Sequence, residues 1–542
     1  MKEYLHSKFK DAEKIIPELA EVSLIFDVPK SAEHGDLSSN AAMLLTKKLK
    51  KNPKVIASEI IEALNLDKSI IAKTEIAGPG FINFFFTQQF SSNIIKDILE
   101  LKENFGSSNK YKGKRANVEF VSANPTGPLT VGHGRNAVVG DTIANLLEFV
   151  GYDVDREYYF NNAGRQMRVL GNSVKLRYLE AAGEKIDFPE DHYQGEYIKD
   201  IAAKLYIEHG DKLREENAES IFKETAEREI FLEIKKTLTA LGINHKIFFN
   251  ENSLYEDGKI NELLKIFDEK NLSYNKDNAL WLKLTELGQT EDKVIVKATG
   301  EPTYRLPDIA YHIVKLSRGY DLLVDIFGTD HIDEYPDVSA ALKALGYDSS
   351  KIKVLIQQFV NVIKDGEVVK MSTRKANFIT IDELIEEVGK DVVRYFFNMR
   401  NINTHMNFDL ALAKKQSDEN PVFYLQYAHA RISSIARRVK EENIEASTEN
   451  LDLLVHEDEK SLIKILNNFK DEILLTAETL ETNKICNYLY DLAAAYHRYN
   501  RSCRILGTEL KLAEARLALA VAVMIVIKNG LKLLGVSAPE KM

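Results

Sequence analysis

One segment, Glu119 to Asp141, constrains the fold of this chain more than any other. Its apolar run breaks at Asn124-Pro125 and Gly127-Pro128, and a helical pattern begins past Gly132-His133-Gly134. The pattern predicts a strand, a tight loop and a helix, which together direct backbone N–H groups and the positive end of the helix at one point. A phosphate or carboxylate is stabilised at such a point. The glycines match neither G-x-G-x-x-G nor G-x-x-x-x-G-K-[ST], so neither hydride transfer nor ordinary NTPase chemistry is indicated.

Composition sets outer limits on the protein. A chain of 542 residues is too long for one hydrophobic core, so roughly two to four domains are expected. The formal net charge of −10 argues against a non-specific nucleic-acid binder, although local basic patches can still bind RNA. The two cysteines, Cys486 and Cys503, cannot complete a zinc site, so no metal site is expected. The longest uncharged apolar run, Leu517 to Ile527, is too short for a membrane span, and a cytoplasmic protein is expected.

The pattern divides the chain into three parts. Residues 1–108 combine helical periodicity with a strand-like run at 76–86, which predicts an α+β module. Residues 109–385 alternate short apolar strands with helices, which predicts a parallel sheet wound by helices, and a charged helical insertion is expected at about 171–292. Residues 386–542 predict connecting helices and a closing helical bundle. Within the sheet domain we expect strands at 118–122, 322–327 and 353–356, and helices at 137–150 and 339–345.

A second cluster, Lys370-Met371-Ser372-Thr373-Arg374-Lys375, brings three cations together on a predicted surface loop. Alone it is equally well explained as a solvated basic loop. A strand-end loop with a histidine at a helix N-terminus, followed far downstream by Lys-Met-Ser-x-x, resembles the joint signature of class I aminoacyl-tRNA synthetases. The physics suits adenylate formation, because the helix end and His133 stabilise phosphate charge while a cationic loop follows the leaving pyrophosphate.

The resemblance narrows to the arginyl-tRNA synthetase family and covers nearly the whole chain. It implies a multidomain α/β protein with a Rossmann-like catalytic domain carrying an inserted subdomain, an N-terminal α+β module and a C-terminal all-α bundle that binds the anticodon. The segments that carry the resemblance are 34–41, 78–84, 122–129, 158–164, 308–312, 328–331 and the tail at 529–542.

For ATP, the resemblance implies contacts from both signatures. The ATP-binding residues implied are Thr130, Gly132, His133, Asp330, Lys370, Met371 and Ser372, and the catalytic ones are Thr130, His133, Lys370, Arg374 and Lys375. Mg²⁺ is expected to accompany ATP.

For arginine, a planar and permanently charged guanidinium calls for carboxylates and an aromatic face. Glu119, Asp308 and Tyr304 are the candidates, with Asn124 for the amino-acid backbone and His331 beside it. Glu119 is alternatively a core carboxylate paired with a basic neighbour, and Asp308 a helix N-cap.

Two positions depart from the class pattern. The usual first histidine of the ATP signature is Thr130, and the usual second lysine of Lys-Met-Ser-Lys is Thr373. The loss of one preorganised donor typically costs about 10²–10³ in rate, which leaves room for a working enzyme. A non-catalytic tRNA-binding paralogue, a cysteinyl-tRNA synthetase and a nucleotidylyltransferase therefore stay as alternatives, of which the missing zinc cysteines count against the second.

Aromatic residues interleaved with arginines in the terminal bundle suit unstacked RNA bases. There we expect Tyr427, Arg431 and Tyr499 to contact tRNA, and Phe423 and Leu425 to lie in the core. In the N-terminal module the family implies base contacts for Phe81 and Asn83. The resemblance thus implies a monomer with L-arginine, ATP and tRNA(Arg) as partners. Arginyl-adenylate forms first, generally only with tRNA bound, and the arginyl group then passes to the 3′ end of the tRNA.

Overall fold

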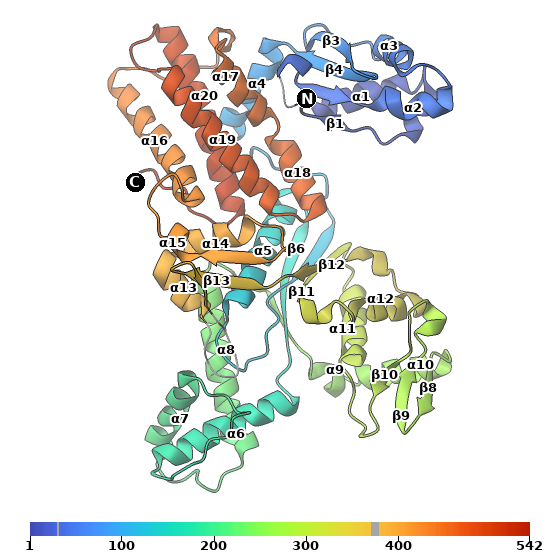
Figure 1. Ribbon diagram of the computed structural model, residues 1–542, viewed down its shortest axis with the longest axis vertical. Helices are drawn as coiled ribbons and strands as arrows, with labels where there is room; N and C mark the ends of the chain where they lie inside the picture. The colour runs from blue at the N-terminus through green and yellow to red at the C-terminus, as the bar shows by residue number, and fades with distance from the viewer. Residues whose placement is uncertain (30–31, 370–378) are drawn as a thin grey trace.

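The computed structural model describes residues 1–29, 32–369 and 379–542 (Figure 1). The predicted cationic cluster lies outside these residues, and with it Lys370, Met371, Ser372, Arg374 and Lys375.

The centre of the molecule is a five-stranded parallel sheet in the order β12-β11-β5-β6-β7, which confirms the predicted fold class. Buried apolar residues such as Val118 and Val324, which pair across β5 and β11, explain why these segments form interior strands. The predicted strand at 118–122 ends early, at Glu119. Val121 and Ser122 take positive φ angles of 71° and 43°, which a strand does not accommodate. The strands are β5 Arg115–Glu119, β6 Asp153–Phe160, β7 Ile247–Asn250, β11 Leu322–Gly328 and β12 Ile352–Gln357.

Three helices of the catalytic part matter for the site: α5 Val131–Phe149, α11 Arg305–Ser317 and α12 Tyr335–Ala344. Helix α5 begins at Val131, earlier than predicted, so His133 lies inside its first turn. A Cβ added to Gly134 would lie 1.9 Å from the Ile381 side chain, and this close packing requires glycine there.

The expected insertion is divided in two by β7, which returns to the sheet beside β6. The first excursion is helical and consists of α6 Gly164–Ala181, α7 Glu196–His209 and α8 Lys223–Ala240. The second carries α9 Ser253–Glu256, α10 Lys259–Glu269 and an antiparallel sheet of β8 Ser273–Lys276, β9 Ala279–Leu282 and β10 Lys293–Val296. The two excursions form separate lobes at the lower left and lower right of Figure 1.

The N-terminal part has its own hydrophobic core around Leu5, Phe9 and Phe84, as expected for an α+β module. Its sheet has the order β1-β2-β4-β3, and α4 leads from it to the central sheet. Its elements are α1 Lys2–Ala12, β1 Phe26–Asp27, β2 Leu37–Ser39, α2 Ala41–Leu49, α3 Pro53–Ala63, β3 Ile71–Ala77, β4 Phe81–Phe86 and α4 Gln88–Leu101.

After the central sheet the chain forms a small sheet in the order β14-β13-β15, and then the helical bundle that fills the upper left of Figure 1 beside the N-terminal module. The connecting elements are β13 Val360–Lys364, β14 Glu367–Val368, α13 Ile381–Val388, α14 Lys390–Asn398, β15 Met406–Asp409 and α15 Leu410–Ala413. The bundle helices are α16 Pro421–Glu441, α17 Glu457–Asn467, α18 Phe469–Thr479, α19 Asn483–Ser502 and α20 Leu510–Leu533.

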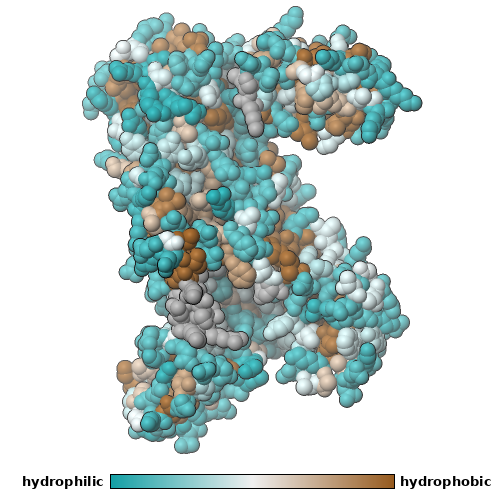
Figure 2. Space-filling view, in the orientation of Figure 1, coloured by the Kyte–Doolittle hydropathy of each residue, from teal (hydrophilic) through white to brown (hydrophobic). Residues whose placement is uncertain are grey.

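Within the described ranges no helix is both long and apolar enough to cross a lipid bilayer. Figure 2 shows a largely hydrophilic face on which apolar side chains form small, separate patches.

Candidate active site

The loop that follows β5 has a strained backbone at the carboxyl edge of the sheet. Val121 and Ser122 both lie in the left-handed region, which is uncommon for residues other than glycine. Two contacts hold them there: the Val121 N–H donates to Asn136 Oδ1 at 2.7 Å, and Ser122 Oγ accepts from the Tyr159 N–H at 3.1 Å. Ligands bind at this edge in open α/β sheets.

The His133 ring is neutral and is a hydrogen-bond donor in the candidate site. Its Nδ1 accepts from the Thr130 N–H at 3.2 Å, so the single proton of the neutral ring lies on Nε2. Burial lowers the pKa of His133 to about 4. The ring therefore presents an N–H group without a positive charge, and the N-terminus of α5 supplies a positive electrostatic potential beside it. Gln357 fixes the turn further, because its Nε2 donates to the Gly132 carbonyl at 2.9 Å.

Arg135 anchors the first turns of α5. Its guanidinium is fully buried and donates to the carbonyls of Thr404 at 2.9 Å, Asn401 at 2.8 Å and Gln358 at 3.2 Å. Burial lowers its pKa to about 10. These bonds tie α5 to the start of β13 and to the loop before β15.

Glu119, at the end of β5, is almost fully buried. Its Oε2 accepts from Lys315 Nζ at 2.7 Å and from the Tyr311 hydroxyl at 2.9 Å, and its Oε1 accepts from Ser122 Oγ at 2.9 Å. Burial raises the pKa of Glu119, and the charge of Lys315 opposes that shift. The carboxylate is thus paired with a basic neighbour, as one of the two sequence interpretations expected.

Asp308 lies in the first turn of α11 and is partly exposed. The alternative that it caps this helix is wrong, because α11 begins at Arg305 and its N-cap position is Tyr304. Tyr304 itself is 76% exposed.

Asn124 ties the loop to the next strand: its Oδ1 accepts from the Asn161 N–H, and its Nδ2 donates to Gln166 Oε1, both at 3.0 Å. His331 follows β11 and stacks on Phe327 at 5.0 Å between ring centroids. Asp330 lies beside it in the short turn Thr329–His331.

Glu251 is an acid that the sequence interpretation missed. It accepts from the Tyr159 hydroxyl at 2.6 Å and from Asn161 Nδ2 at 2.8 Å. Burial raises the pKa of Glu251, and the charge of Asp308 adds to that shift. The signal was present: Glu251 directly follows β7, at the carboxyl edge of the sheet. Because residues 171–292 were interpreted as an insertion, Glu251 was not predicted as a site residue.

The predicted tRNA contacts in the bundle differ in exposure. Tyr427 is 39% exposed and accepts a hydrogen bond from Arg431 at 2.9 Å. Tyr499 is only 1% exposed, and its hydroxyl donates to the Arg516 carbonyl at 3.0 Å. This position does not suit stacking on an RNA base, and the structure gives Tyr499 a packing role instead. Leu425 is buried, as expected.

The two tRNA contacts predicted in the N-terminal module also differ in exposure. Phe81 is exposed at the start of β4. Asn83 is buried, and its Oδ1 accepts from Ser38 Oγ at 2.7 Å. Asn83 therefore joins β2 to β4 rather than presenting its amide to solvent.

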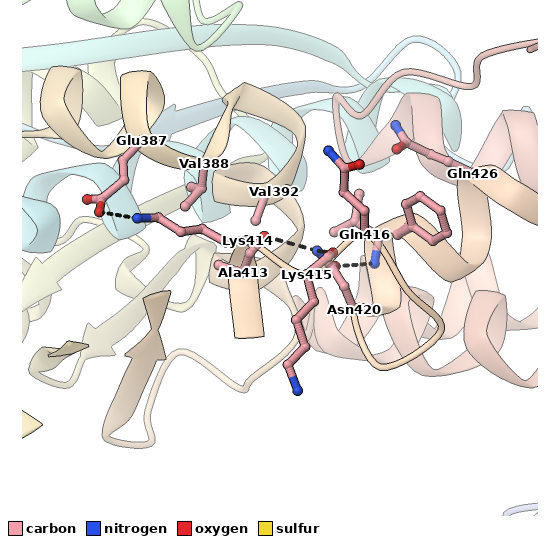
Figure 3. A pocket seen from close by; sticks show the side chains of 11 residues that line it. Glu387, Val388, Val392, Ala413, Lys414, Lys415, Gln416, Asn420 and Gln426 are labelled. Atoms are coloured by element: carbon pink, nitrogen blue, oxygen red, sulfur yellow. Dashed lines mark hydrogen bonds and ion pairs between the residues drawn. The ribbon is translucent and has the colours of Figure 1, made fainter. Parts of the chain in front are cut away.

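A cavity of about 230 Å³ lies away from these residues, between α13, α14, the loop after α15 and the start of α16 (Figure 3). Val388, Val392 and Ala413 contribute apolar walls, and Lys414 pairs with Glu387 at 2.7 Å on its rim. It contains none of the candidate ATP or arginine residues.

Three family models match this chain. "Arginyl tRNA synthetase N terminal domain" matches residues 2–86, "tRNA synthetases class I (R), catalytic domain" matches 94–409, and "DALR anticodon binding domain" matches 425–542. The chain is 49% identical over 525 residues to an arginine–tRNA ligase of Chlorobaculum parvum, with 95% of each chain covered. It is 48% identical to that of Salinibacter ruber, with 100% of each covered.

A solved structure, the Thermus thermophilus arginyl-tRNA synthetase, shares the fold with a TM-score of 0.79 at 22% identity, covering 99% of each chain. The catalytic model alone matches more than half of the residues, and the relatives match from end to end. The chain therefore belongs to the arginyl-tRNA synthetase family.

Proposed function

We propose that the carboxyl edge of the central sheet is where this arginine–tRNA ligase activates arginine with ATP. The observation that carries the assignment is the set of acids at the edge of the sheet where α5 begins: Glu119 ends β5, Glu251 follows β7 and Asp308 lies in the first turn of α11. A guanidinium needs acids, and ATP phosphates need backbone N–H groups and a helix N-terminus. The alternatives of a cysteinyl enzyme and a nucleotidylyltransferase do not fit the family.

The reaction has two steps. The arginine carboxylate attacks the α-phosphorus of ATP, arginyl-adenylate forms and pyrophosphate leaves. A terminal ribose hydroxyl of tRNA(Arg) then attacks the activated carbonyl carbon, and AMP leaves. No covalent intermediate on the protein is needed, so catalysis rests on position and electrostatics.

For the ATP side, we assign Thr130, Gly132 and His133 to the phosphates. The Nε2–H of His133 and the positive end of α5 stabilise phosphate oxygens. Asp330 is assigned to the adenosine. Lys370, Met371, Ser372, Arg374 and Lys375 lie outside the described residues; we assign them, from their sequence, to ATP and the leaving pyrophosphate.

Mg²⁺ enters with ATP as part of that substrate. The described residues contain no group of three or more His, Cys, Asp or Glu side chains that could hold a metal. Mg²⁺ bound to nucleotides is usually held mainly by phosphate oxygens.

For the arginine side, Asp308 and Glu251 bind the guanidinium, and Tyr304 covers it from the N-cap position of α11. Asn124 and His331 lie on the two loops that flank the amino-acid backbone. Glu119 contributes an acceptor at the floor of this pocket.

For tRNA, we assign Tyr427 and Arg431 on α16 and Phe81 on β4, because all three side chains are exposed. Asn83 and Tyr499 support these surfaces from within. We also propose that the chain acts as a cytoplasmic monomer divided at 1–108, 109–385 and 386–542. Light scattering with and without tRNA measures the molar mass and so tests whether the protein is a monomer.

The direct test is pyrophosphate exchange that depends on arginine and cognate tRNA. We expect exchange in the wild type and a loss of about 10²–10³-fold in His133→Ala, because one preorganised donor to phosphate is removed. His405→Ala, an exposed histidine before β15, is the matched control. Absence of exchange under every condition, with tRNA still bound tightly, would overturn the assignment.

A further inference from the structure

A row of polar residues on one face of α11 connects two candidate arginine-binding acids, Asp308 and Glu119. Tyr311 and His312 lie three and four residues after Asp308, and Lys315 lies four and three residues after them, so the four residues share one side of the helix. That side faces the ends of β5 and β11, because Tyr311 bonds Glu119 and His312 bonds Asp325. The row runs from the partly exposed first turn into a fully buried interior.

Lys315 is the innermost member of this row, and its side chain is 0% exposed. The Nζ atom lies 2.7 Å from Glu119 Oε2 and also forms an ion pair with Asp325, whose side chain is equally buried. It lies 4.9 Å from the centroid of the Tyr311 ring. The buried ammonium of Lys315 therefore pairs with two carboxylates that belong to different strands of the sheet.

His312 supplies the second positive charge of this cluster. Its Nδ1 lies 2.8 Å from the Asp308 carbonyl and its Nε2 lies 3.1 Å from Asp325 Oδ2. A carbonyl and a carboxylate are both acceptors, so both ring nitrogens carry protons and the imidazole is charged. Burial alone lowers the pKa of His312, but the hydrogen bond and charge of Asp325 outweigh it and raise that pKa.

In this cluster Glu119 and Asp325 are paired with Lys315 and His312, and His312 Nδ1 also lies 3.9 Å from Asp308 Oδ1. The nearby acid Glu157 is separately engaged, since both its oxygens accept from Arg318, at 2.7 and 2.8 Å. Glu119 accepts three hydrogen bonds and donates none, as an ionised carboxylate does. Its charge is already neutralised before any substrate arrives.

We propose that Lys315 is a positioning residue of the arginine site: its ammonium neutralises Glu119 and Asp325 and so holds the Glu119 carboxylate in place for the substrate guanidinium. This inference rests on the proposed function. Glu119 then acts on the substrate only as a hydrogen-bond acceptor held in place by Lys315. Without the ammonium, two buried carboxylates repel each other and one of them moves or takes up a proton.

The test is a double-variant comparison in pyrophosphate exchange. Lys315→Met keeps the length of the side chain and removes the charge, whereas the double variant Lys315→Met/Asp325→Asn removes one acid together with the base. For Lys315→Met we expect the KM for arginine to rise at least about tenfold, the usual order for a lost charge-assisted hydrogen bond. The KM for ATP should stay within about twofold, because the cluster lies on the arginine side.

The double variant should return the KM for arginine to within about threefold of wild type, because it restores the charge balance that a buried pair requires. A purely structural role for Lys315 predicts the opposite, since the double variant loses still more contacts. Lys464→Met is the control for loss of a half-buried lysine, because Lys464 bonds the Gly35 carbonyl at the N-terminal module.

If Lys315→Met does not fold, the double variant Lys315→Met/Asp325→Asn tests the proposal instead. Its folding with a KM for arginine near that of wild type supports the proposal, and its failure to fold or to bind arginine overturns it. An unchanged KM for arginine in Lys315→Met also overturns the proposal. Wild-type exchange without arginine dependence would instead overturn the proposed function, so the two failures are distinguishable.

Discussion

Asp308 is partly exposed to solvent, whereas Glu119 is buried and paired. The two residues look alike in the sequence, and burial separates their roles. The Asp308 carboxylate has one long ion pair, 3.9 Å from Oδ1 to His312 Nδ1, and we expect it to form a bidentate pair with a guanidinium.

Replacement of Asp308 by asparagine keeps the size of the side chain and removes its charge. We expect the KM for arginine to rise about 10- to 100-fold, in line with the loss of a hydrogen bond to a charged group. The KM for ATP should change little. Asp257→Asn, an exposed acid at the end of α9, is the control. Equal effects of Asp308→Asn on both substrates would count against a guanidinium contact.

His245 shows how burial of a single side chain affects stability. Its ring packs against Phe120 at 4.3 Å and Tyr158 at 5.4 Å between centroids, and burial lowers its pKa from 6.5 to about 4. Between these values the unfolded chain binds a proton that the folded chain does not, so the free energy of unfolding falls as pH falls from 6.5 to 4.

His245→Phe keeps the aromatic packing and removes this titration. Its stability gain should therefore be larger at pH 5 than at pH 7.5, by about 1–2 kcal/mol. Thermal unfolding at the two pH values measures the difference, with His405→Phe, an exposed ring stacked on Phe359, as control. Equal gains at both pH values would show that His245 titrates normally in the folded protein.

At the scale of elements, helices α16 and α19 place similar tyrosines in different environments. Tyr427 on α16 is exposed beside Arg431, and Tyr499 on α19 lies inside the bundle. Helical periodicity shows which residues share a face, but not which face of a bundle helix is covered by its neighbours.

Tyr427→Ala should weaken tRNA binding by about 1–3 kcal/mol, the usual contribution of stacking on one base, with little change in the unfolding temperature. Tyr499→Ala should instead lower stability by about 3–5 kcal/mol, as loss of a buried aromatic side chain does. Filter binding of tRNA and thermal unfolding separate the two effects. Tyr255→Ala, an exposed tyrosine on α9, should affect neither; weaker tRNA binding by Tyr255→Ala would show that the assay is not specific to the bundle.

The central sheet illustrates what sequence patterns predict well. Continuous apolar runs predicted β11 at 322–327 and β12 at 353–356, and the observed strands are Leu322–Gly328 and Ile352–Gln357. A strand buried on both faces must be apolar throughout, and this requirement is visible in the sequence. The strand β7 was missed because its four residues lie between charged helices.

At the scale of the whole molecule, Arg394 joins the catalytic helices to the bundle. Its buried guanidinium donates to Asp141 on α5 at 2.6 Å, to the Leu241 carbonyl after α8 at 2.9 Å and to the Leu534 carbonyl after α20 at 2.7 Å. Gly535 fits beside it only because it lacks a side chain: an added Cβ would lie 2.2 Å from Arg394 Nε. The end of α20, the last long helix, is therefore fixed against the helix that begins at the active site.

Arg394→Met leaves Asp141 and two carbonyls without this partner, so we expect a loss of about 3 kcal/mol in the free energy of unfolding. Because the contact joins separate parts of the molecule, the thermal transition should broaden or divide in two. Calorimetry measures both effects. Arg437→Met, an exposed arginine of α16 paired with Glu540, is the control. A single sharp transition at the wild-type temperature would show that Arg394 does not couple these parts.

The sequence by itself determined the family, the parallel sheet and the segments that meet at its carboxyl edge. These depend on local apolar patterns and on short motifs, which are written in consecutive residues. Only the tertiary structure decided which polar side chains are free to meet a substrate. The pairing of Glu119 with Lys315, the hydrogen bonds of Glu251 with Tyr159 and Asn161, and the burial of Tyr499 and Asn83 all depend on residues distant in sequence. Burial and pairing depend on what packs against a side chain, and no local pattern contains that information.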